Sequence, residues 1–544
     1  MFRLPARLAV FLLVAATAAG LIALMLAALA PGGWTPVRAA ILISFLPVAL
    51  WLGVCVGNSV PGFLVLLLAR HPARAVLPVE GDIDAGPITA RTALAVTIRN
   101  EDMAAVLPPL ACLLAALGDP NHFTLFLLSD TQDPALAAGE AAAVAGFSHP
   151  VRYRRRTDNA GFKAGNVMDF LDHHLGDNDF VLMLDADSEM SAAAVRRLVR
   201  ILQAAPRLGL VQTLIAGRPA AMAFPRLFQF GMRAGMRIWA LGQAVWQGDE
   251  GPYWGHNAIF RAAPFRTHCR LAPLPDGSAI LSHDQVEAAR LRAAGWGVAI
   301  WADDDGSYES NPPALPEFLH RDARWLAGNL QYRHLLALPG FRPLGRWQLV
   351  QAILMFADAP LYIMLLLLGV AAALEAPEAY PRGALLALAV AWPLCRYAPK
   401  LLGYLAVLLV PDQRARHGGF WRFAAGALAE IVFSLVLDAV SNLSKTLAML
   451  RLAFGARAGW LPQNRSDRGV GWEEAARLFW PHTLLGLAAF AVLVHATPAM
   501  ALLALPFGGG LLVAIPFCVL TSSPAASAWL RRHGIAALTE EISR

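Results

Sequence analysis

Apolar residues divide the chain into two apolar blocks with a segment of ordinary composition between them. Residues 8–69 and 348–520 are mostly apolar, whereas residues 70–347 mix apolar and charged positions as soluble domains do. Only 15% of all residues are charged, against about 25% in typical soluble proteins. The pattern therefore predicts one soluble domain inserted between two membrane blocks.

The N-terminal block contains two long apolar runs. Residues 8–30 carry no charge, and a helix of that length crosses a hydrocarbon core of ~30 Å. The alternative is a signal peptide, because Arg3 and Arg7 precede the run, but the apolar core of a signal peptide is shorter, about 7–15 residues. We expect residues 1–75 to form a membrane block of two transmembrane helices, the second at residues 40–69.

The middle segment alternates short apolar runs with helical stretches such as residues 192–205. This alternation predicts an α/β domain over residues 76–345 with a mainly parallel sheet. The runs that we expect to form its strands are residues 94–98, 123–128, 180–184 and 209–213.

Acidic residues follow three of these expected strands. Ligands of open α/β sheets bind at the carboxyl ends of the strands, and those ends deliver Glu101, Asp130, Asp185 and Asp187 to one crevice. Asp185 and Asp187 are alternate residues after an apolar strand, so both carboxylates can turn toward one cation. Carboxylate oxygens suit Mg²⁺ or Mn²⁺, and the pair therefore predicts a divalent metal site.

The C-terminal block, residues 346–530, is predicted to hold four or more transmembrane helices and to lead into a tail at residues 531–544. Residues 423–450 differ from the rest of the block, because polar residues recur along them at steps of three and four. We expect this segment to be an interfacial helix, or to line a polar channel, and to cross the membrane zero or two times. The expected spans are residues 348–374, 383–410, 482–499 and 501–520, and the polar stripe consists of Glu430, Ser434, Asp438, Ser441 and Lys445.

The net charge of +6 and the isoelectric point near 9.3 come from arginines beside the apolar runs. Such residues stay on the cytoplasmic side of membrane helices, so Arg3, Arg7, Arg70 and Arg74 predict a cytoplasmic middle domain. This explanation removes the reason to expect a nucleic-acid partner, and we expect none. The five cysteines lie far apart, without the spacing of a zinc site or a disulfide framework.

Four further segments carry polar chemistry. Lys163 precedes a glycine that lets backbone approach a ligand, and residues 253–257 (YWGHN) combine aromatic, glycine and polar residues suited to a sugar. Asp284 opens a helical run, where its alternative role is that of a helix cap. Residues 321–325 (RDARW) precede the membrane block, where a juxtamembrane anchor is the alternative. The arginines within residues 152–156 are interpreted as a solvated basic face.

In their order along the chain, these segments resemble the glucans biosynthesis glucosyltransferase H family. That family is a branch of the processive family-two glycosyltransferases, which include cellulose synthase. The resemblance extends over residues 95–340 and is carried by LLSDTQDP, RRRTDNAGFKAGNVMDF, FVLMLDADSEM, YWGHNAIFR, LSHDQVEAARLRAAGWGV and RDARWLAGNLQ. Phe162 departs from the expected pattern, because a polar or basic residue is expected there.

The resemblance implies a GT-A-type domain inserted in an α-helical transmembrane bundle. It further implies an inverting enzyme of the bacterial inner membrane that uses UDP-glucose and Mg²⁺ or Mn²⁺ to build the β-1,2-linked backbone of osmoregulated periplasmic glucans. Its partners would be the growing glucan chain, the lipid bilayer and a periplasmic glucan-processing protein. The implied roles are nucleotide-sugar binding by Thr97, Glu101, Asp130, Lys163, Asp185, Arg321 and Arg324, metal binding by Asp185 and Asp187, acceptor binding by His256, Asn257 and Trp325, and general base catalysis by Asp284.

Two alternative functions remain. Another processive family-two synthase, making cellulose, chitin or hyaluronan, would share the same motifs. A transporter with a nucleotide-sensing domain would explain the polar stripe in residues 423–450, but it leaves Asp284 and residues 324–325 unexplained.

The arginine distribution also gives a test of topology. Residues 451–481 are arginine-rich, so we expect this loop to be cytoplasmic together with both termini and the middle domain. A cysteine introduced by Ser466→Cys should resist a membrane-impermeant thiol reagent applied from outside intact cells, and should react after lysis. Strong labelling in intact cells would contradict the predicted topology.

Overall fold

A seven-stranded mixed sheet forms the centre of the middle domain. Its strands are β1 (Thr92–Ile98), β2 (Phe123–Ser129), β3 (Val151–Arg155), β4 (Phe180–Asp185), β6 (Leu208–Thr213), β8 (Ala258–Arg261) and β9 (Gly297–Trp301). Their order is β3-β2-β1-β4-β8-β6-β9, and β8 runs antiparallel between β4 and β6 while the other pairs are parallel. The four predicted strands coincide with β1, β2, β4 and β6, so the predicted mainly parallel sheet is confirmed. The computed structural model describes residues 3–303, 305–375, 380–456 and 466–542.

Helices cover both faces of this sheet. One face carries α4 (Met103–Leu117) and α7 (Ala192–Ala204), and the other carries α6 (Phe162–His173), α9 (Ala262–His268) and α10 (Asp284–Ala293). Along β1, Leu94 and Val96 belong to the apolar core on the first face, whereas Ala93 and Ala95 belong to the core on the second. Because successive side chains point to opposite faces and both faces are buried, the strands read as continuous apolar runs.

A second, three-stranded sheet lies beside the carboxyl end of β4. It consists of β5 (Glu189–Met190), β10 (Ser307–Glu309) and β7 (Ala216–Gly217), with β10 in the middle. Tyr308 pairs with Glu189 on one side and with Ala216 on the other. This pairing brings Glu309 from a distant part of the sequence to the acidic end of β4.

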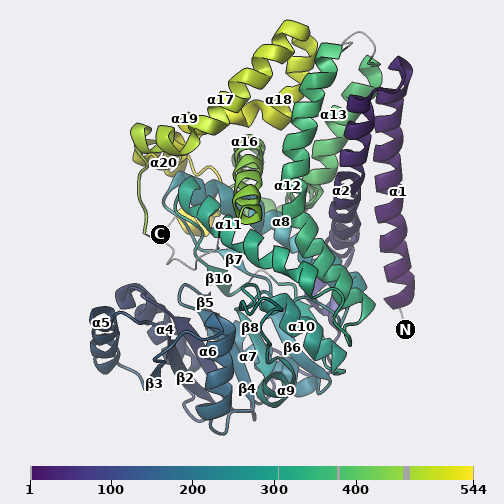
Figure 1. Cartoon of the computed structure of the whole chain (residues 1–544). Helices are drawn as coiled ribbons and strands as arrows, with labels where there is room; N and C mark the ends of the chain where they lie inside the picture. The colour runs from purple at the N-terminus through teal and green to yellow at the C-terminus, as the bar shows by residue number, and fades with distance from the viewer. Residues whose placement is uncertain (1–2, 304, 376–379, 457–465, 543–544) are drawn as a thin grey trace.

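Two helices connect this domain to the bundle above it in Figure 1. They are α8 (Ala223–Gln247) and α11 (Leu315–Gln331). Helix α8 packs against the membrane block, and α11 is tied to it by an ion pair of 3.0 Å between the Asp322 carboxylate and the Lys445 Nζ atom. A further ion pair of 3.0 Å joins Arg7 of the first helix to Glu250, just after α8.

The bundle contains five helices that are long and apolar enough to cross a membrane. Two further pairs of helices are bent, by 73° within residues 382–409 and by 60° within residues 498–521, and raise the number to as many as seven if each pair is one span. These helices make the chain a multi-pass membrane protein. The five long helices are α1 (Arg3–Leu29), α2 (Pro36–Leu68), α12 (Pro343–Glu375), α16 (Phe420–Ala453) and α17 (Trp472–Ala496), and the bent pairs are α13 (Arg382–Arg396) with α14 (Ala398–Leu409) and α18 (Pro498–Leu512) with α19 (Ala514–Thr521).

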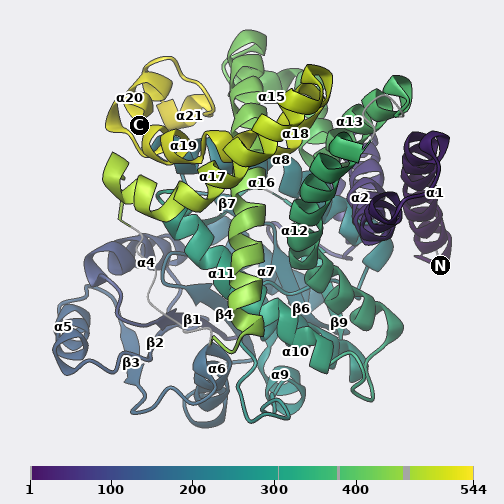
Figure 2. The ribbon, with the colours of Figure 1, turned by 45° about the horizontal axis from the view of Figure 1, so that its top comes forward.

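Helix α16 contains the predicted polar stripe and is one unbroken helix. The alternative of two crossings by this segment is therefore wrong, because a single helix cannot turn back through the membrane. In Figure 1, α16 is viewed nearly along its axis, whereas α1 and α2 run up the page. Figure 2 shows more of the length of α16. Helix α16 thus lies across α1 and α2, although its length and hydropathy also suit a span. Its interfacial position stays a prediction.

The polar stripe of α16 faces other helices. The Glu430 carboxylate is fully buried and accepts a hydrogen bond from Lys400 Nζ at 2.5 Å. The Arg396 guanidinium, at the break between α13 and α14, donates hydrogen bonds of 2.7 Å to Asp438 of α16 and to Asp358 of α12. Buried charges need such partners, so the stripe serves to join α12, α13, α14 and α16.

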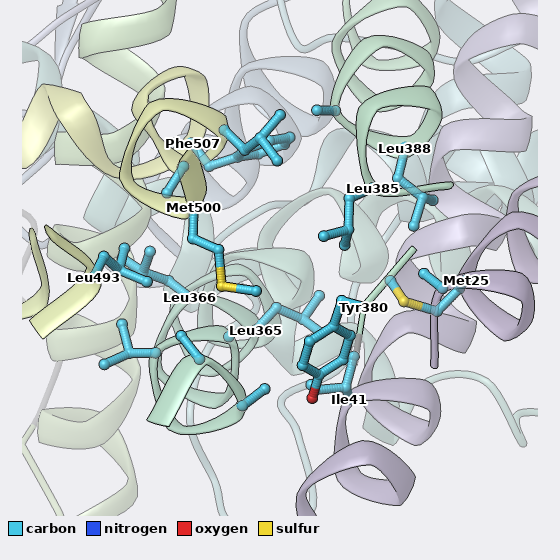
Figure 3. A pocket seen from close by; sticks show the side chains of 18 of the residues that line it. Met25, Ile41, Leu365, Leu366, Tyr380, Leu385, Leu388, Leu493, Met500 and Phe507 are labelled. Atoms are coloured by element: carbon cyan, nitrogen blue, oxygen red, sulfur yellow. The ribbon is translucent and has the colours of Figure 1, made fainter. Parts of the chain in front are cut away.

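An apolar cavity of about 240 Å³ lies within the bundle, between α1, α2, α12, α13 and α18. Figure 3 shows Met25, Leu365, Leu385, Met500 and Phe507 around it. Among the described residues that line it, none carries a carboxylate, amine or imidazole. The cavity therefore lacks a group that could act as a general base or hold a diphosphate, and the candidate site lies elsewhere.

Candidate active site

The carboxyl end of β4 brings together the first predicted site residues. Asp185 is the last residue of β4, and its carboxylate contacts the Nζ atom of Lys163 in the first turn of α6. The Thr97 hydroxyl, from the neighbouring strand β1, donates a hydrogen bond of 3.3 Å to Asp185 Oδ1. The sheet register pairs Thr97 with Asp185 directly, so the strand order itself assembles this group.

The loop around Gly255 connects this group to Asp284. Lys163 Nζ donates a second hydrogen bond, of 2.9 Å, to the Gly255 carbonyl oxygen. The other side of the glycine runs against Asp284, because a Cβ added to Gly255 would lie 3.7 Å from Asp284 Oδ2. Gly255 has a φ of 87°, which favours glycine. The Lys163 ammonium group and the Asp284 carboxylate therefore lie on opposite sides of the backbone turn at Gly255.

Asp284 is the first residue of α10 and is half-buried. Burial raises the pKa of the Asp284 carboxyl, and the neighbouring His283 partly offsets this effect. His283 Nδ1 lies 2.8 Å from Glu287 Oε2, one turn along α10. A carboxylate with a raised pKa is a stronger base than an exposed one, which suits it to accept a proton.

Helix α11 braces the loop that carries Asp284. The Gln331 side chain accepts a hydrogen bond of 2.9 Å from the Leu281 amide and donates one of 3.1 Å to the Ala279 carbonyl. Gly328 packs directly on Ser282, since a Cβ added to Gly328 would lie 2.2 Å from Ser282 Oγ. Gly328 thus allows α11 to lie close against Ser282, two residues before Asp284.

The same helix presents Arg321 and Trp325 to the site. The Arg321 guanidinium lies over the Trp325 ring, 4.5 Å from its centroid, and burial lowers the pKa of Arg321 although Glu309 and Asp322 act in the opposite direction. Trp325 is 43% exposed, so its ring retains a free surface. Arg324 lies between them and is half-buried.

Asp130 follows β2 and is held by Arg156, one of the arginines that were expected to form a solvated basic face. Arg156 donates two hydrogen bonds of 2.7 Å to the two Asp130 oxygens, in the bidentate geometry that guanidinium groups favour. Arg154 forms an ion pair of 3.2 Å with Asp169 and is also largely buried. The interpretation of these arginines as a solvated basic face is therefore wrong for Arg154 and Arg156, because each balances a carboxylate.

The buried Glu140 carboxylate holds two neighbouring loops in place. One loop lies between β1 and α4, and the other follows β2. Glu140 accepts hydrogen bonds from Ser129 Oγ at 2.6 Å and from the Thr131 hydroxyl. Thr131 Oγ1 in turn accepts one of 2.8 Å from the Asn100 amide, where the backbone has a φ of 56°. Glu101 follows this turn and is half-buried. Glu101 and Asp130 thus lie in the loops that follow the adjacent strands β1 and β2, and β1 also pairs with β4, which ends at Asp185.

His256 and Asn257 occupy different positions. His256 is half-buried and has Ser188 Oγ 3.3 Å from its Nδ1 atom and Glu309 Oε2 3.4 Å from its Nε2 atom. Asn257 is fully buried at a φ of 46°, and its side chain donates hydrogen bonds to Ser307 Oγ at 3.0 Å and to the Tyr308 carbonyl at 3.2 Å. Asn257 therefore holds the loop of His256 onto β10.

Glu309 is a site residue that the sequence analysis missed. Burial raises the pKa of the Glu309 carboxyl, His256 and Arg321 oppose this, and Asp187 and Asp185 add to it. The carboxylates of Asp185, Asp187 and Glu309 thus share one region. No signal along the sequence marks Glu309, because only the pairing of β10 in the second sheet brings it there.

The donor set around Asp185 and Asp187 fits a divalent cation. Carboxylate oxygens are the ligands that Mg²⁺ and Mn²⁺ favour, and Glu309 adds a third carboxylate near these two acids. Within the described residues, no group of three or more His, Cys, Asp or Glu side chains forms a complete metal cage. Mg²⁺ at phosphate sites is commonly held by one or two carboxylates together with the phosphates.

Comparisons with known proteins agree with this geometry. A family model described as glycosyl transferase family group 2 matches residues 180–410. A glucans biosynthesis glucosyltransferase H of Xanthomonas campestris pv. campestris is 34% identical over 547 residues, covering 95% of this chain and 84% of the relative. The protein of that name from Ralstonia nicotianae is 36% identical over 526 residues, covering 90% of this chain and 60% of the relative.

A solved structure shows a weaker likeness. A mannosyltransferase from Pyrobaculum calidifontis, in complex with GDP-Man and Mn²⁺, is similar at a TM-score of 0.41 and 16% identity, covering 66% of this chain and 99% of that one. That score is too low to carry an argument, whereas the relatives align along almost the whole chain. The chain belongs to the glucans biosynthesis glucosyltransferase H family and is a membrane-embedded glycosyltransferase.

Proposed function

We propose that this enzyme transfers glucose from UDP-glucose to a growing glucan, with inversion, and so builds the β-1,2-linked backbone of osmoregulated periplasmic glucans. One observation carries the proposal: Lys163 contacts both the Asp185 carboxylate and the Gly255 carbonyl, and Gly255 packs against Asp284. A diphosphate site and a half-buried base are thereby held on opposite sides of one loop, as a single displacement requires. The relatives named for glucan biosynthesis support the choice of product.

In this mechanism Asp284 removes the proton from the acceptor hydroxyl as its oxygen attacks the anomeric carbon of the donor glucose. The bond from that carbon to UDP breaks on the opposite side, so an α-linked donor gives a β-linked product. Arg321 and Arg324 face the leaving diphosphate and stabilise its charge. Asp185 and Asp187 would hold Mg²⁺ or Mn²⁺, which neutralises the diphosphate when bound.

The remaining site residues bind the two substrates. Thr97, Glu101 and Asp130 line the uridine end, with Arg156 holding Asp130 in position. His256 and the exposed ring of Trp325 face the acceptor sugar. Asn257 was expected to face the acceptor as well, but its buried side chain suits it to position His256 instead.

We further propose that the enzyme lies in the bacterial inner membrane with its catalytic domain in the cytoplasm, where UDP-glucose is made. The arginines that flank the apolar helices support this orientation. A synthase of cellulose, chitin or hyaluronan would use the same site, so linkage analysis of the polymer formed from a panel of UDP-sugars separates these products. A nucleotide-sensing transporter would release no UDP in that assay.

The first test is Asp284→Asn. Asparagine keeps the shape and can still accept a hydrogen bond from the Gln285 amide in the first turn of α10, but it cannot take a proton, so glucosyl transfer should fall by about 10²–10⁴-fold. UDP-glucose affinity should persist. Because the pKa of Asp284 is raised, the wild-type rate should fall as the pH drops through that pKa, and the variant should lose this acidic limb.

The measurement is UDP release alongside UDP-glucose affinity across a pH series. Asp276→Asn is the control, since Asp276 is exposed in the preceding loop and contacts Ser278. Near-normal transfer by Asp284→Asn would remove this carboxylate from the mechanism and leave it a structural role at the start of α10.

A second test is Trp325→Ala. Loss of an aromatic face that stacks on the terminal sugar should reduce polymer formation about three- to tenfold, with UDP-glucose affinity unchanged. Trp529→Ala is the control, because Trp529 is similarly exposed on another helix. Equal loss of nucleotide affinity would assign Trp325 to donor binding or folding.

A third test is Gly328→Ala. The added Cβ would lie 2.2 Å from Ser282 Oγ and 2.9 Å from the Ser282 amide nitrogen, so α11 and the Asp284 loop must separate. Transfer should fall about tenfold or more through misplacement of the base, while UDP-glucose still binds. Gly139→Ala is the matched control, because this helical glycine has open space around it. Unchanged transfer by Gly328→Ala would show that the brace does not position Asp284.

A further inference from the structure

A second cavity, of about 200 Å³, lies at the seam between the catalytic domain and the membrane block. Its walls come from the end of α2, from α8, from α14 and from the segment around α15 (Pro411–Arg416). It shares no lining residue with the site of Asp185 and Asp284.

The polar part of this cavity is strongly basic. Four arginines line it, Arg70, Arg233, Arg237 and Arg416, and no carboxylate is among the described lining residues. They come from the turn after α2, from α8 and from α15, which are far apart in the sequence. Guanidinium groups gathered in this way are suited to bind phosphate oxygens, because each offers several donors in a planar fork.

The protein itself directs two carboxylates at this cluster. Glu541 of the short helix α21 (Thr539–Ile542) forms an ion pair of 2.5 Å with Arg233 and is almost fully buried there. Glu540 forms a more exposed ion pair of 2.9 Å with Arg416. The arginines therefore already accept anionic groups in the structure, and any other anion at Arg233 competes with Glu541.

The rest of the cavity wall is mostly apolar and comes largely from the membrane helices. Leu66 lies in the last turn of α2, a candidate span that ends at Leu68. Val407 and Val410 of the bent pair and Phe230 of α8 complete the wall. Because Arg70 follows the span immediately, the cavity lies at the depth of the lipid headgroups, where acyl chains and phosphates meet.

We propose that this cavity binds the phosphodiester headgroup of an anionic phospholipid. The arginines hold the phosphate, the acyl chains leave along α2 and α14 into the bilayer, and the headgroup displaces Glu541 from Arg233. Free phosphate shares the arginine chemistry but cannot use the apolar wall. Bound lipid would fasten α8 of the catalytic domain to the membrane helices.

The test is native mass spectrometry of the full chain in detergent, titrated with dioleoyl-phosphatidylglycerol, dioleoyl-phosphatidylcholine or inorganic phosphate. Phosphatidylglycerol should bind about tenfold or more tightly than either alternative. Arg233→Gln and Arg237→Gln should each weaken phosphatidylglycerol binding about tenfold and leave phosphatidylcholine binding unchanged. Arg477→Gln, an exposed arginine paired with Glu473, should have no effect.

Glu541→Gln distinguishes a specific effect on the cavity from misfolding. It should strengthen phosphatidylglycerol binding, because it removes the carboxylate that competes for Arg233. UDP release in the same preparations checks that each variant is folded. Equal binding of the two lipids, or inorganic phosphate binding as tightly as phosphatidylglycerol, would overturn the lipid site. Weaker or unchanged binding by Glu541→Gln would overturn the competition at Arg233.

Discussion

Helix α11 is clamped between the membrane block and the catalytic loop, and the rest of the site depends on that clamp. On one side, the Asp322–Lys445 ion pair joins it to α16, with Ser441 donating a further hydrogen bond of 3.2 Å to Asp322. On the other side, Gly328 and Gln331 hold the loop before Asp284. Breaking a buried ion pair by removing one partner costs about 3–5 kcal/mol. The position of the base relative to the bundle is therefore fixed by contacts on both faces of one helix.

This arrangement fastens part of the proposed catalytic site directly to the membrane block. Arg321 and Trp325 lie on the same helix as Asp322, so the groups proposed to face the diphosphate and the acceptor are fastened directly to α16. The buried charges of α16 then continue the connection to α12, α13 and α14. Such pairs are weak evidence for stability, but each one specifies which helices are neighbours.

Electrostatic balance is the second constraint on the site. Asp185 is balanced by Lys163, Asp130 by Arg156, and Glu309 lies among His256, Arg321 and the acids after β4. Carboxylates removed from water require such partners, and the partners here come from separate elements. The result is a group of carboxylates and cations that lie close together, an arrangement that suits the proposed cation and diphosphate.

The sequence by itself determined the elements and much of the chemistry. Apolar runs identified β1, β2, β4 and β6 and the membrane helices, because burial on both faces or in lipid leaves a continuous apolar signal. The acids after those strands and the ordered motifs identified the family. Only the tertiary structure decided which charges meet: Arg156 with Asp130, Glu309 with His256, and Lys445 with Asp322. These pairs join residues far apart in the chain, and a side chain's spacing along the sequence carries no information about a partner that folding brings from elsewhere.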